Sequence, residues 1–206
     1  MWILAPWFMH EFSKKIEETN KGILLVKDKE FLLKEANKTW QFFKDNVVNS
    51  LPSDNYQGDR KRKIAPITSP TNIGLYILST VAAYDLKFED LPSTIDRLTS
   101  TIEVVENLTK WNGHLYNWYN IYTLEPVKPM YISSVDSGNF VGYLYTVKQF
   151  LLEKNVEQYD LVKKIDNIIK NTDFSKLYNP KIGLFSIGYN AQDNILTDSY
   201  YDLLAT

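Results

Sequence analysis

The stretch SPTNIGLYILSTVAAYDL, residues 69–86, decides the fold class of this chain. Ser69 is a good N-cap, and Pro70 fits the first position of a helix, where no backbone N–H is needed. The run from Ile73 to Leu86 is apolar almost all round, which predicts a helix that is buried on all sides. Such an inner helix needs other helices to cover it.

Hydrophobic periodicity predicts these covering helices on both sides of residues 69–86. The segments 28–48, 93–110 and 156–170 are amphipathic, whereas 137–152 is again apolar on most sides, and a sixth helix is expected to begin at Thr197-Asp198-Ser199-Tyr200. The apolar positions of the amphipathic segments are Phe31, Leu32, Ala36, Trp40, Phe43 and Val47, then Ile95, Leu98, Ile102, Val105 and Leu108, then Tyr159, Val162, Ile165 and Ile169. Amphipathic helices are expected on the outside and apolar helices on the inside, and the two kinds alternate along the chain. This alternation predicts an all-α fold of the partial α/α toroid type. A simple up-down bundle would not need it.

The connections between the predicted helices fall into two classes. Long loops, 49–68, 111–136 and 171–198, lead into inner helices, whereas short ones, 87–93 and 153–155, lead into outer helices. If the helices alternate in direction, all long loops lie at one end of the fold. Long loops in a compact domain are usually functional, so this end is the predicted binding face. Residues 117–119 and 131–133 are expected to form short strands of a β-ribbon there.

The loop WNGHLYNWYNIYTLEPVKPMYISSVD, residues 111–136, is rich in aromatic residues that alternate with His114, Asn117 and Asp136. Aromatic faces pack on the C–H faces of sugars, and Asn, Asp and His bind hydroxyl groups, so the loop is typical of a sugar site. The alternative is that the aromatic rings only anchor the loop on the core. Its aromatic residues are Trp111, Tyr116, Trp118, Tyr119, Tyr122 and Tyr131.

Asp136, in the stretch SSVDSGNF of residues 133–140, has two possible roles. It precedes the predicted inner helix 137–152, where a carboxylate at the N-cap position accepts backbone N–H groups and complements the helix dipole. It also faces the predicted binding end, where it could bind a substrate. Thr68-Ser69 and Thr197-Asp198 hold the equivalent position before the other inner helices, so capping is a common role and all three clusters point to one face.

Composition excludes several function classes. The 206 residues are 44% hydrophobic and 23% charged with a net charge of −2, which is typical of one globular domain and gives no support for nucleic-acid binding. Arg60, Lys61, Arg62 and Lys63 could bind phosphate, but acidic residues precede them and we interpret them as a solvated loop. The chain has no cysteine and only two histidines, and no catalytic triad or nucleotide motif is visible, so we expect neither a metal nor a cofactor.

The start of the chain, MWILAPWFM, is apolar but too short to cross a bilayer. It lacks the basic region and cleavage site of a signal peptide. Residues 1–27 are therefore interpreted as a lead-in, which is either a buried N-terminal segment or the end of a membrane segment.

Seven short stretches together resemble the central glycoamylase-like domain of cyclic β-1,2-glucan synthases. In chain order they are LPSDNYQ from Leu51, TSPTNIGL from Thr68, GHLYNWY from Gly113, TLEP from Thr123, SVDSGN from Ser134, FSIGYN from Phe185 and YYDLLA from Tyr200. The resemblance runs from about residue 28 to the end. The basic run 60–63, Pro66 and residues 140–143 depart from the family pattern, which puts fine substrate specificity in doubt.

The resemblance implies that residues 28–206 are the N-terminal part of a glycoamylase-like α/α barrel, a domain that in the family continues past the position of Thr206. Such a domain cleaves linear β-1,2-glucan and re-joins it as a ring. It belongs to a large bacterial, membrane-associated synthase, and is expected on the cytoplasmic side of the inner membrane. The implied partners are a β-glucan and the rest of a multidomain chain. The chain alone is expected to be inactive and to self-associate, because half a ring leaves apolar surface uncovered.

A glycosidase or transglycosylase normally needs two carboxylates around the scissile bond. Asp136 is the best single candidate here, and the family places further acidic motifs outside this chain, so the catalytic pair stays open. The expected substrate-binding residues are Asn55, Tyr56, Thr71, Asn72, His114, Trp118, Tyr119, Asp136, Asn139 and Tyr189. The alternative function is a non-catalytic glucan-binding or scaffold module, which would bind glucan without turnover.

Overall fold

A computed structural model of the chain describes residues 24–59, 61, 63–154 and 159–201. The chain divides into two units, Met1–Glu35 and Ala36–Thr206. The described part of the first unit is residues 24–35. The predicted lead-in lies largely outside the described residues. None of the helices in the described ranges is long and apolar enough to cross a membrane.

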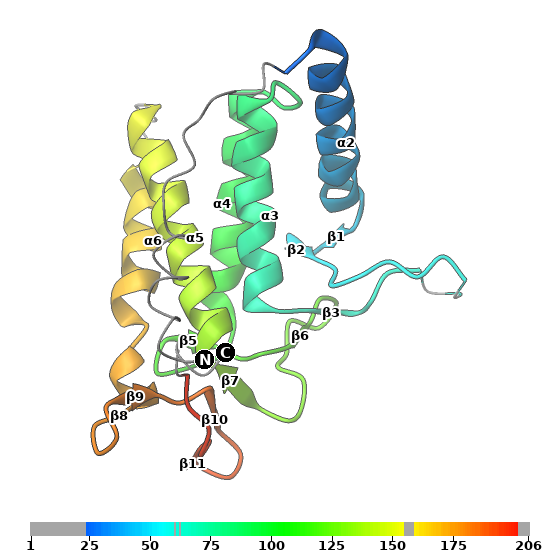
Figure 1. Ribbon diagram of the computed structural model, residues 1–206. Coiled ribbons are helices and arrows are strands. Elements are labelled where there is room, and N and C mark those ends of the chain that lie inside the picture. Colours follow the sequence, from blue (N-terminus) through cyan, green and yellow to red (C-terminus); the bar gives the residue numbers. More distant parts are fainter. Residues whose placement is uncertain (1–23, 60, 62, 155–158, 202–206) are drawn as a thin grey trace, which may run out of the picture. The chain divides into compact units, whose positions relative to one another are not determined.

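All five predicted helices that fall in the described ranges are present (Figure 1). They are α2 (Val26–Asp45), α3 (Pro70–Asp85), α4 (Leu91–Asn107), α5 (Ser134–Glu153) and α6 (Tyr159–Asn171). A short 3-10 helix, η2, spans Phe174–Leu177. The expected sixth helix is absent through Tyr201, because residues 199–201 are extended: Ser199 accepts a hydrogen bond from the backbone of Ile187, and Tyr200 forms a β-bridge with Ser186.

The start of α3 is as predicted. Ser69 caps it, with its Oγ accepting the backbone N–H of Asn72 at 3.2 Å, and Pro70 is the first helical residue. Helix α4 begins two residues earlier than predicted, at Leu91, because Asp90 accepts the N–H of Ser93 at 2.8 Å and acts as its cap.

The predicted capping role of Asp136 is wrong. Helix α5 begins at Ser134, and Ser133 is its N-cap, with Oγ accepting the N–H of Asp136 at 3.2 Å. Ser133 is held in extended backbone geometry because it is the last residue of a strand that pairs with Gly188. Asp136 therefore lies in the first turn of the helix, and its carboxylate is not used for capping.

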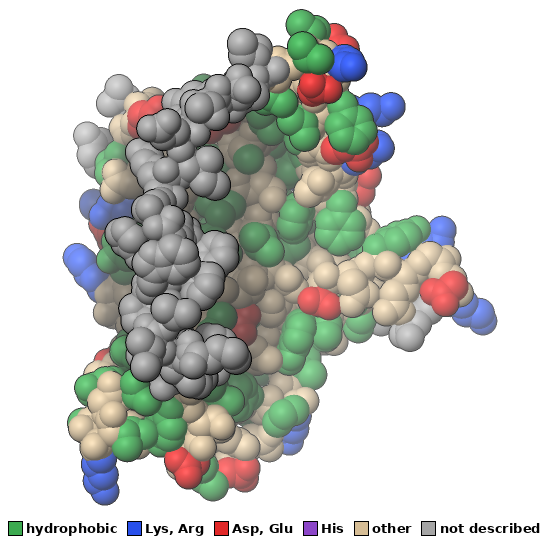
Figure 2. Space-filling model, in the orientation of Figure 1, with side chains coloured by type: hydrophobic (Ala, Val, Ile, Leu, Met, Phe, Trp, Pro, Cys, Tyr) green, Lys and Arg blue, Asp and Glu red, His purple; other side chains and the backbone are tan. Residues whose placement is uncertain are grey.

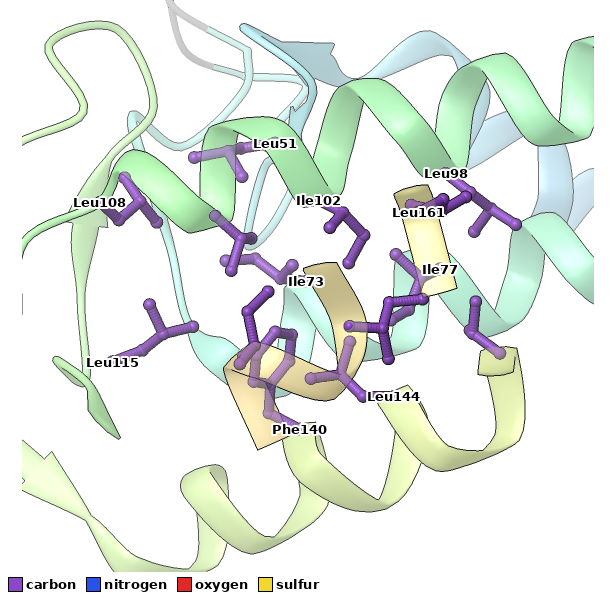
Figure 3. Close-up of a cluster of buried hydrophobic side chains, with 14 of the residues drawn as sticks. Leu51, Ile73, Ile77, Leu98, Ile102, Leu108, Leu115, Phe140, Leu144 and Leu161 are labelled. Atoms are coloured by element: carbon purple, nitrogen blue, oxygen red, sulfur yellow. The ribbon is translucent and has the colours of Figure 1, made fainter. Parts of the chain in front are cut away.

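The second unit has the expected alternation of helices. Helix α3 packs along α5, α4 packs on α3 and α6, and α6 also packs on α5. Side chains from all four helices meet in one core (Figure 3), which includes Ile73, Ile77, Leu98, Ile102, Phe140, Leu144 and Leu161. Within α2, Trp40 is buried and packs with Tyr76 and Ala83 of α3.

Three burial predictions fail. Helix α3 is not buried on all sides, because Leu75 is 40% exposed. In the first unit, Phe31 and Leu32 are 61% and 51% exposed rather than buried. Helix α5 is not covered on all sides, since Val135, Tyr145 and Leu152 are 45–52% exposed. These three residues lie on one side of α5, which packs mainly against α3 and α6 with its other sides. Because this side is apolar, the sequence pattern predicted that α5 is buried on all sides.

The three long connections contain short antiparallel strands, at the end of the fold where these connections were expected to gather (Figure 1). The two-stranded ribbons are β1–β2, β3–β6, β4–β5 and β8–β9, and the three-stranded sheet has the order β11–β10–β7. The bounds are β1 (Val47–Val48), β2 (Leu51–Pro52), β3 (Ile67–Thr68), β4 (Lys110–Trp111), β5 (His114–Leu115), β6 (Tyr119–Asn120), β7 (Tyr131–Ser133), β8 (Tyr178–Asn179), β9 (Leu184–Phe185), β10 (Gly188–Asn190) and β11 (Ile195–Leu196).

The predicted strands near 117–119 and 131–133 correspond to β6 and β7, but each pairs with a different segment. Strand β6 pairs with β3, directly before α3, and β7 pairs with β10. These pairings bring residues from three separate loops to the beginnings of α3 and α5.

Candidate functional site

The first turns of α3 and α5 carry polar side chains that do not take part in helix capping. Because Ser69 and Ser133 supply the capping oxygens, Thr71, Asn72 and Asp136 are left to interact with other groups. The N-terminal end of a helix carries a partial positive charge, which favours carboxylates placed beside it. The two helices pack along each other, and their first turns meet through side-chain hydrogen bonds.

Asp136 is held by donors from two different segments. The hydroxyl of Thr71 donates to Asp136 Oδ1 at 2.5 Å, and Thr71 in turn accepts a longer bond, 3.4 Å, from the amide of Asn139. With the Asn117 amide oriented to satisfy its neighbours, its nitrogen donates to Asp136 Oδ2 at 3.1 Å, and its oxygen accepts from Trp118 Nε1 at 3.0 Å. Each oxygen of the carboxylate thus has one donor.

Asp54 is held by amide donors in a similar way, and one of these donors is Asn72, the residue after Thr71 in α3. Asn72 donates from its amide to Asp54 Oδ1 at 2.7 Å, and Asn55 donates to Asp54 Oδ2 at 2.8 Å. Thr71 and Asn72 are consecutive, so one helical turn anchors two carboxylates, Asp136 from the first turn of α5 and Asp54 from the loop after β2. We call the eight residues of these contacts the polar cluster: Asp54, Asn55, Thr71, Asn72, Asn117, Trp118, Asp136 and Asn139.

The polar cluster has the capacity to bind hydroxyl groups. An ionised carboxylate accepts hydrogen bonds at about four lone-pair positions, and the contacts above account for two on each Asp. All eight residues are partly exposed. A ligand that carries several hydroxyl groups can donate to the remaining positions, while the surrounding amides and Thr71 fix the direction of each carboxylate.

The backbone of loop 111–136 places Asn117 and Trp118 at this cluster. The N–H of Asn117 donates to the carbonyl of Tyr131 at 2.7 Å, and the carbonyl of Trp118 accepts from Val127 at 2.9 Å. The next residue, Tyr119, pairs with Thr68 directly before the cap of α3. The loop is therefore fixed on both sides of Asn117, which contacts Asp136, and of Trp118, which donates to Asn117.

Two expected sugar-binding residues lie in the core instead. His114 is 1% exposed, in edge-to-face contact with Phe174 at 5.0 Å between ring centres. Tyr119 is 0% exposed, and its hydroxyl donates to the carbonyl of Thr109 at 2.6 Å. Burial raises the pKa of Tyr119 far above its usual range. Both side chains hold the loop on the core, which was the alternative interpretation of its aromatic residues.

The environment of His114 is unusual for a polar group. Neither ring nitrogen has a well-aligned hydrogen-bond partner among the described residues. Burial lowers the pKa of His114, and the nearby backbone and carboxylate of Asp173 oppose this shift only in part. The histidine therefore serves as a neutral core side chain.

Tyr56 and Tyr189 lie outside the contacts of the polar cluster in the described structure. Tyr56 is 48% exposed next to the basic run, in a β-bridge with Ile64. Tyr189 stacks on Trp111 with 4.1 Å between ring centres. The structure thus brings together six of the ten expected residues: Asn55, Thr71, Asn72, Trp118, Asp136 and Asn139.

Asp54 is the member of the cluster that was not predicted to bind sugar, whereas Asn117 was part of the sugar-site interpretation of loop 111–136 but not of the ten expected binding residues. The signal for Asp54 was present, since it lies in the LPSDNYQ stretch next to Asn55. In the described ranges no three His, Asp or Glu side chains gather in a way that could hold a metal ion. The exposed Lys61 and Lys63 lie in the loop between β2 and β3, as expected of a solvated run.

Known proteins resemble this chain in sequence and in fold. No protein-family model matches the sequence. The chain is 38% identical over 159 residues to the cyclic β-(1,2)-glucan synthase NdvB of Rhizobium meliloti, an alignment that covers 74% of this chain and 6% of that protein. An endo-β-1,2-glucanase from Chitinophaga pinensis, solved with sophorotriose and glucose, superposes with a TM-score of 0.73 at 16% identity, over 83% of this chain and 43% of that one. A β-1,2-glucanase from Parabacteroides distasonis gives 0.70 at 19% identity, over 82% and 24%.

The fold is therefore that of the α/α toroid proteins related to glucoamylase, as predicted. The chain is related in sequence to a cyclic β-1,2-glucan synthase, which confirms the resemblance seen in its motifs. It spans only 6% of the length of that bacterial relative.

Proposed function

We propose that this chain, a relative of a segment of cyclic β-1,2-glucan synthase, forms the sugar-binding part of a domain that cleaves β-1,2-glucan chains and re-joins them. The observation that carries the proposal is the fixed carboxylate of Asp136, which Thr71 and Asn117 orient at the paired beginnings of α3 and α5. The related synthase and the glucan-bound solved relative support β-1,2-glucan as the ligand.

The chemistry of the polar cluster suits a sugar better than a charged or flat ligand. Its two carboxylates accept hydrogen bonds from hydroxyl groups, and the amides of Asn55, Asn72 and Asn139 can both donate and accept. Trp118 donates from its indole nitrogen to Asn117 and is partly exposed, and an aromatic ring of this kind can pack on a sugar C–H face. This combination of a few convergent polar groups with an aromatic side chain is typical of small-ligand sites.

The proposed catalytic role of the domain needs two carboxylates on opposite sides of the scissile bond. Asp136 is the best candidate in this chain, but amide and hydroxyl donors hold both Asp136 and Asp54 in fixed orientations. Such contacts suit ligand positioning. We therefore expect the chain alone to bind glucan without turning it over, and we propose that the catalytic pair is completed elsewhere in a larger, membrane-associated synthase on the cytoplasmic side of the inner membrane.

The second candidate is a non-catalytic glucan-binding module. It is favoured by the same observation, that both carboxylates of the polar cluster are anchored by neutral donors. Cleavage or re-joining of glucan that depends on Asp136 would contradict it.

The test is calorimetric titration of the chain with linear β-1,2-glucan oligosaccharides, with β-1,3- and β-1,4-glucans of the same length for comparison. Wild-type protein is expected to bind the β-1,2-linked chains, and Asp136→Asn to weaken this binding. Asp96→Asn, at an exposed position of α4, is the matched control and should bind as wild type.

Mass spectrometry of the same mixtures reports on turnover. Unchanged glucan after incubation agrees with binding alone. Shortened chains or rings would show that this chain is itself an enzyme, and loss of these products in Asp136→Asn would assign the carboxylate to the reaction. If wild-type protein binds no β-1,2-glucan, the proposed function is wrong.

A further inference from the structure

A largely apolar hollow lies between the first turn of α5 and the β8–β9 ribbon. Its volume is about 450 Å³, and its walls include Val135, Phe174, Tyr178, Leu184, Phe185 and Tyr201. This volume is in the range of small-ligand sites, roughly 300–1,000 Å³. In Figure 2, hydrophobic side chains gather at the end of the molecule where Figure 1 shows β8 and β9.

The ribbon presents two aromatic rings to this hollow. Tyr178 and Phe185 are cross-strand partners, and their ring centres lie 5.3 Å apart at an angle of 60°. Both side chains remain well exposed, at 40% and 43%. The tight turn that joins the strands includes Gly183 at φ +71°, a backbone conformation that favours glycine. These rings pack on each other without being buried, which leaves their outer faces free for a ligand.

One wall of the hollow is the first turn of α5, which also carries Asp136. Val135 lines the hollow and is the residue before Asp136 in α5. Tyr201, on another wall, has its pKa raised by burial and further by Tyr131 and the charge of Asp136. The phenol of Tyr201 is therefore protonated near neutral pH, and lies close enough to Asp136 to be influenced by its charge. An apolar, ring-lined space thus contains a hydroxyl donor, Tyr201, and shares the first turn of α5 with Asp136.

We propose that this hollow binds the glucosyl unit next to the one held at the polar cluster, so that a β-glucan chain passes from Asp136 onto the rings of Tyr178 and Phe185. A glucosyl ring has apolar C–H faces and a polar rim, which match the aromatic wall and the polar edge. This inference rests on the proposed function. It predicts that the affinity of the protein for glucan depends on the length of the glucan.

The experiment measures affinity against glucan length for wild-type protein and Phe185→Ala, using the β-1,2-linked disaccharide and longer linear β-1,2-glucans in calorimetric titrations. Wild-type affinity should rise with length. Loss of one ring contact should weaken binding of the long chains about three- to tenfold and reduce the gain with length. Phe185→Leu, which keeps apolar volume but removes the ring, should give the same result if Phe185→Ala folds poorly.

Tyr145→Ala is the control, because Tyr145 is also aromatic and 52% exposed but lies on α5 away from the walls of the hollow. Tyr145→Ala should leave the dependence of affinity on glucan length unchanged.

If Phe185→Leu and Phe185→Ala keep the wild-type dependence of affinity on glucan length, the hollow is not a glucan site and our proposal is overturned. It is also overturned if these changes only reduce self-association in sedimentation, which would make the hollow a contact between copies. Failure of the wild type to bind any glucan would instead contradict the proposed function.

Discussion

The hydroxyl of Thr71 donates a hydrogen bond of 2.5 Å to Asp136 Oδ1 and so joins the first turn of α3 to the first turn of α5. The two residues are 65 positions apart in the chain. The bond orients a carboxylate that the helix itself does not use, because Ser133 is the cap of α5. This relationship turns two helix beginnings into one potential ligand site.

Thr71→Val is expected to weaken binding of β-1,2-glucan roughly tenfold, because a hydrogen bond to a charged group contributes about 1.5–3 kcal/mol. Thr71→Ser retains the hydroxyl and should restore most of the affinity. Calorimetric titration measures both. The exposed Thr146, on α5, provides the control Thr146→Val. Wild-type affinity in Thr71→Val would mean that orientation of Asp136 does not matter for binding.

Asp54→Asn is expected to reduce glucan affinity to a similar extent as Asp136→Asn. The new amide nitrogen would face the donor groups of Asn55 and Asn72, so that two hydrogen bonds cannot both be kept. Asp59→Asn, an exposed change in the same loop, should have no effect. The measurement is the same titration, with a thermal melt to check folding. If Asp54→Asn lowers the melting temperature but the folded protein binds glucan with wild-type affinity, Asp54 has a purely structural role.

Gly74→Ala is expected to lower the free energy of unfolding by about 1–3 kcal/mol, as overpacking of a core does. A Cβ at Gly74 would lie 2.1 Å from Cδ2 of Tyr143, so α3 and α5 would have to move apart. Gly142→Ala on α5 is the matched control, because a Cβ there meets no atom within 4 Å. It should stabilise the helix by about 0.5–1 kcal/mol. Urea denaturation measures both, and a stabilising Gly74→Ala would contradict the close contact.

Acidification should destabilise the protein through His114. Its pKa is lowered by burial in the folded state, whereas in the unfolded chain it is about 6.5. Between these two pKa values the unfolded state binds more protons, so stability falls as pH drops below about 6.5 and this contribution levels off below the folded pKa. The melting temperature of His114→Leu should therefore fall less than that of the wild type between neutral pH and pH 5. Parallel pH profiles for the two proteins would show that His114 does not titrate in this way.

The chain is expected to self-associate at high concentration, because α5 exposes Val135, Tyr145 and Leu152 along one side. Sedimentation equilibrium measures this association. A Leu152→Lys change should reduce it without altering the core. A monodisperse monomer at all concentrations would mean that this side of α5 does not drive association.

Much of the helical part of the fold could be predicted from local sequence. The Ser69-Pro70 start, the amphipathic pattern of α4 and the long loops each depend on neighbouring residues alone, and the structure confirms them. The prediction that the long connections gather at one end was also confirmed, because helices that alternate in direction must place these connections together.

The sequence did not reveal which polar residues meet, or which aromatic residues are buried. His114 and Tyr119 look like ligand-binding residues among the aromatic residues of their loop, but both lie in the core. Asp54 lies in the LPSDNYQ stretch, but its hydrogen bonds with Asn72 and Asn55 are formed only in the folded chain. Short polar-aromatic loops carry no periodicity, so nothing local distinguishes their inner from their outer side chains.

The sequence by itself determined the helices, their alternation and the end at which the long loops gather, because capping and hydrophobic periodicity act over a few residues. The tertiary structure decided the role of Asp136. Pairing of Ser133 with Gly188 keeps Ser133 extended, so α5 starts at Ser134 and the carboxylate is released from capping. Its new partners, Thr71 and Asn117, come from distant segments, and only packing of α3 against α5 brings them within hydrogen-bond distance.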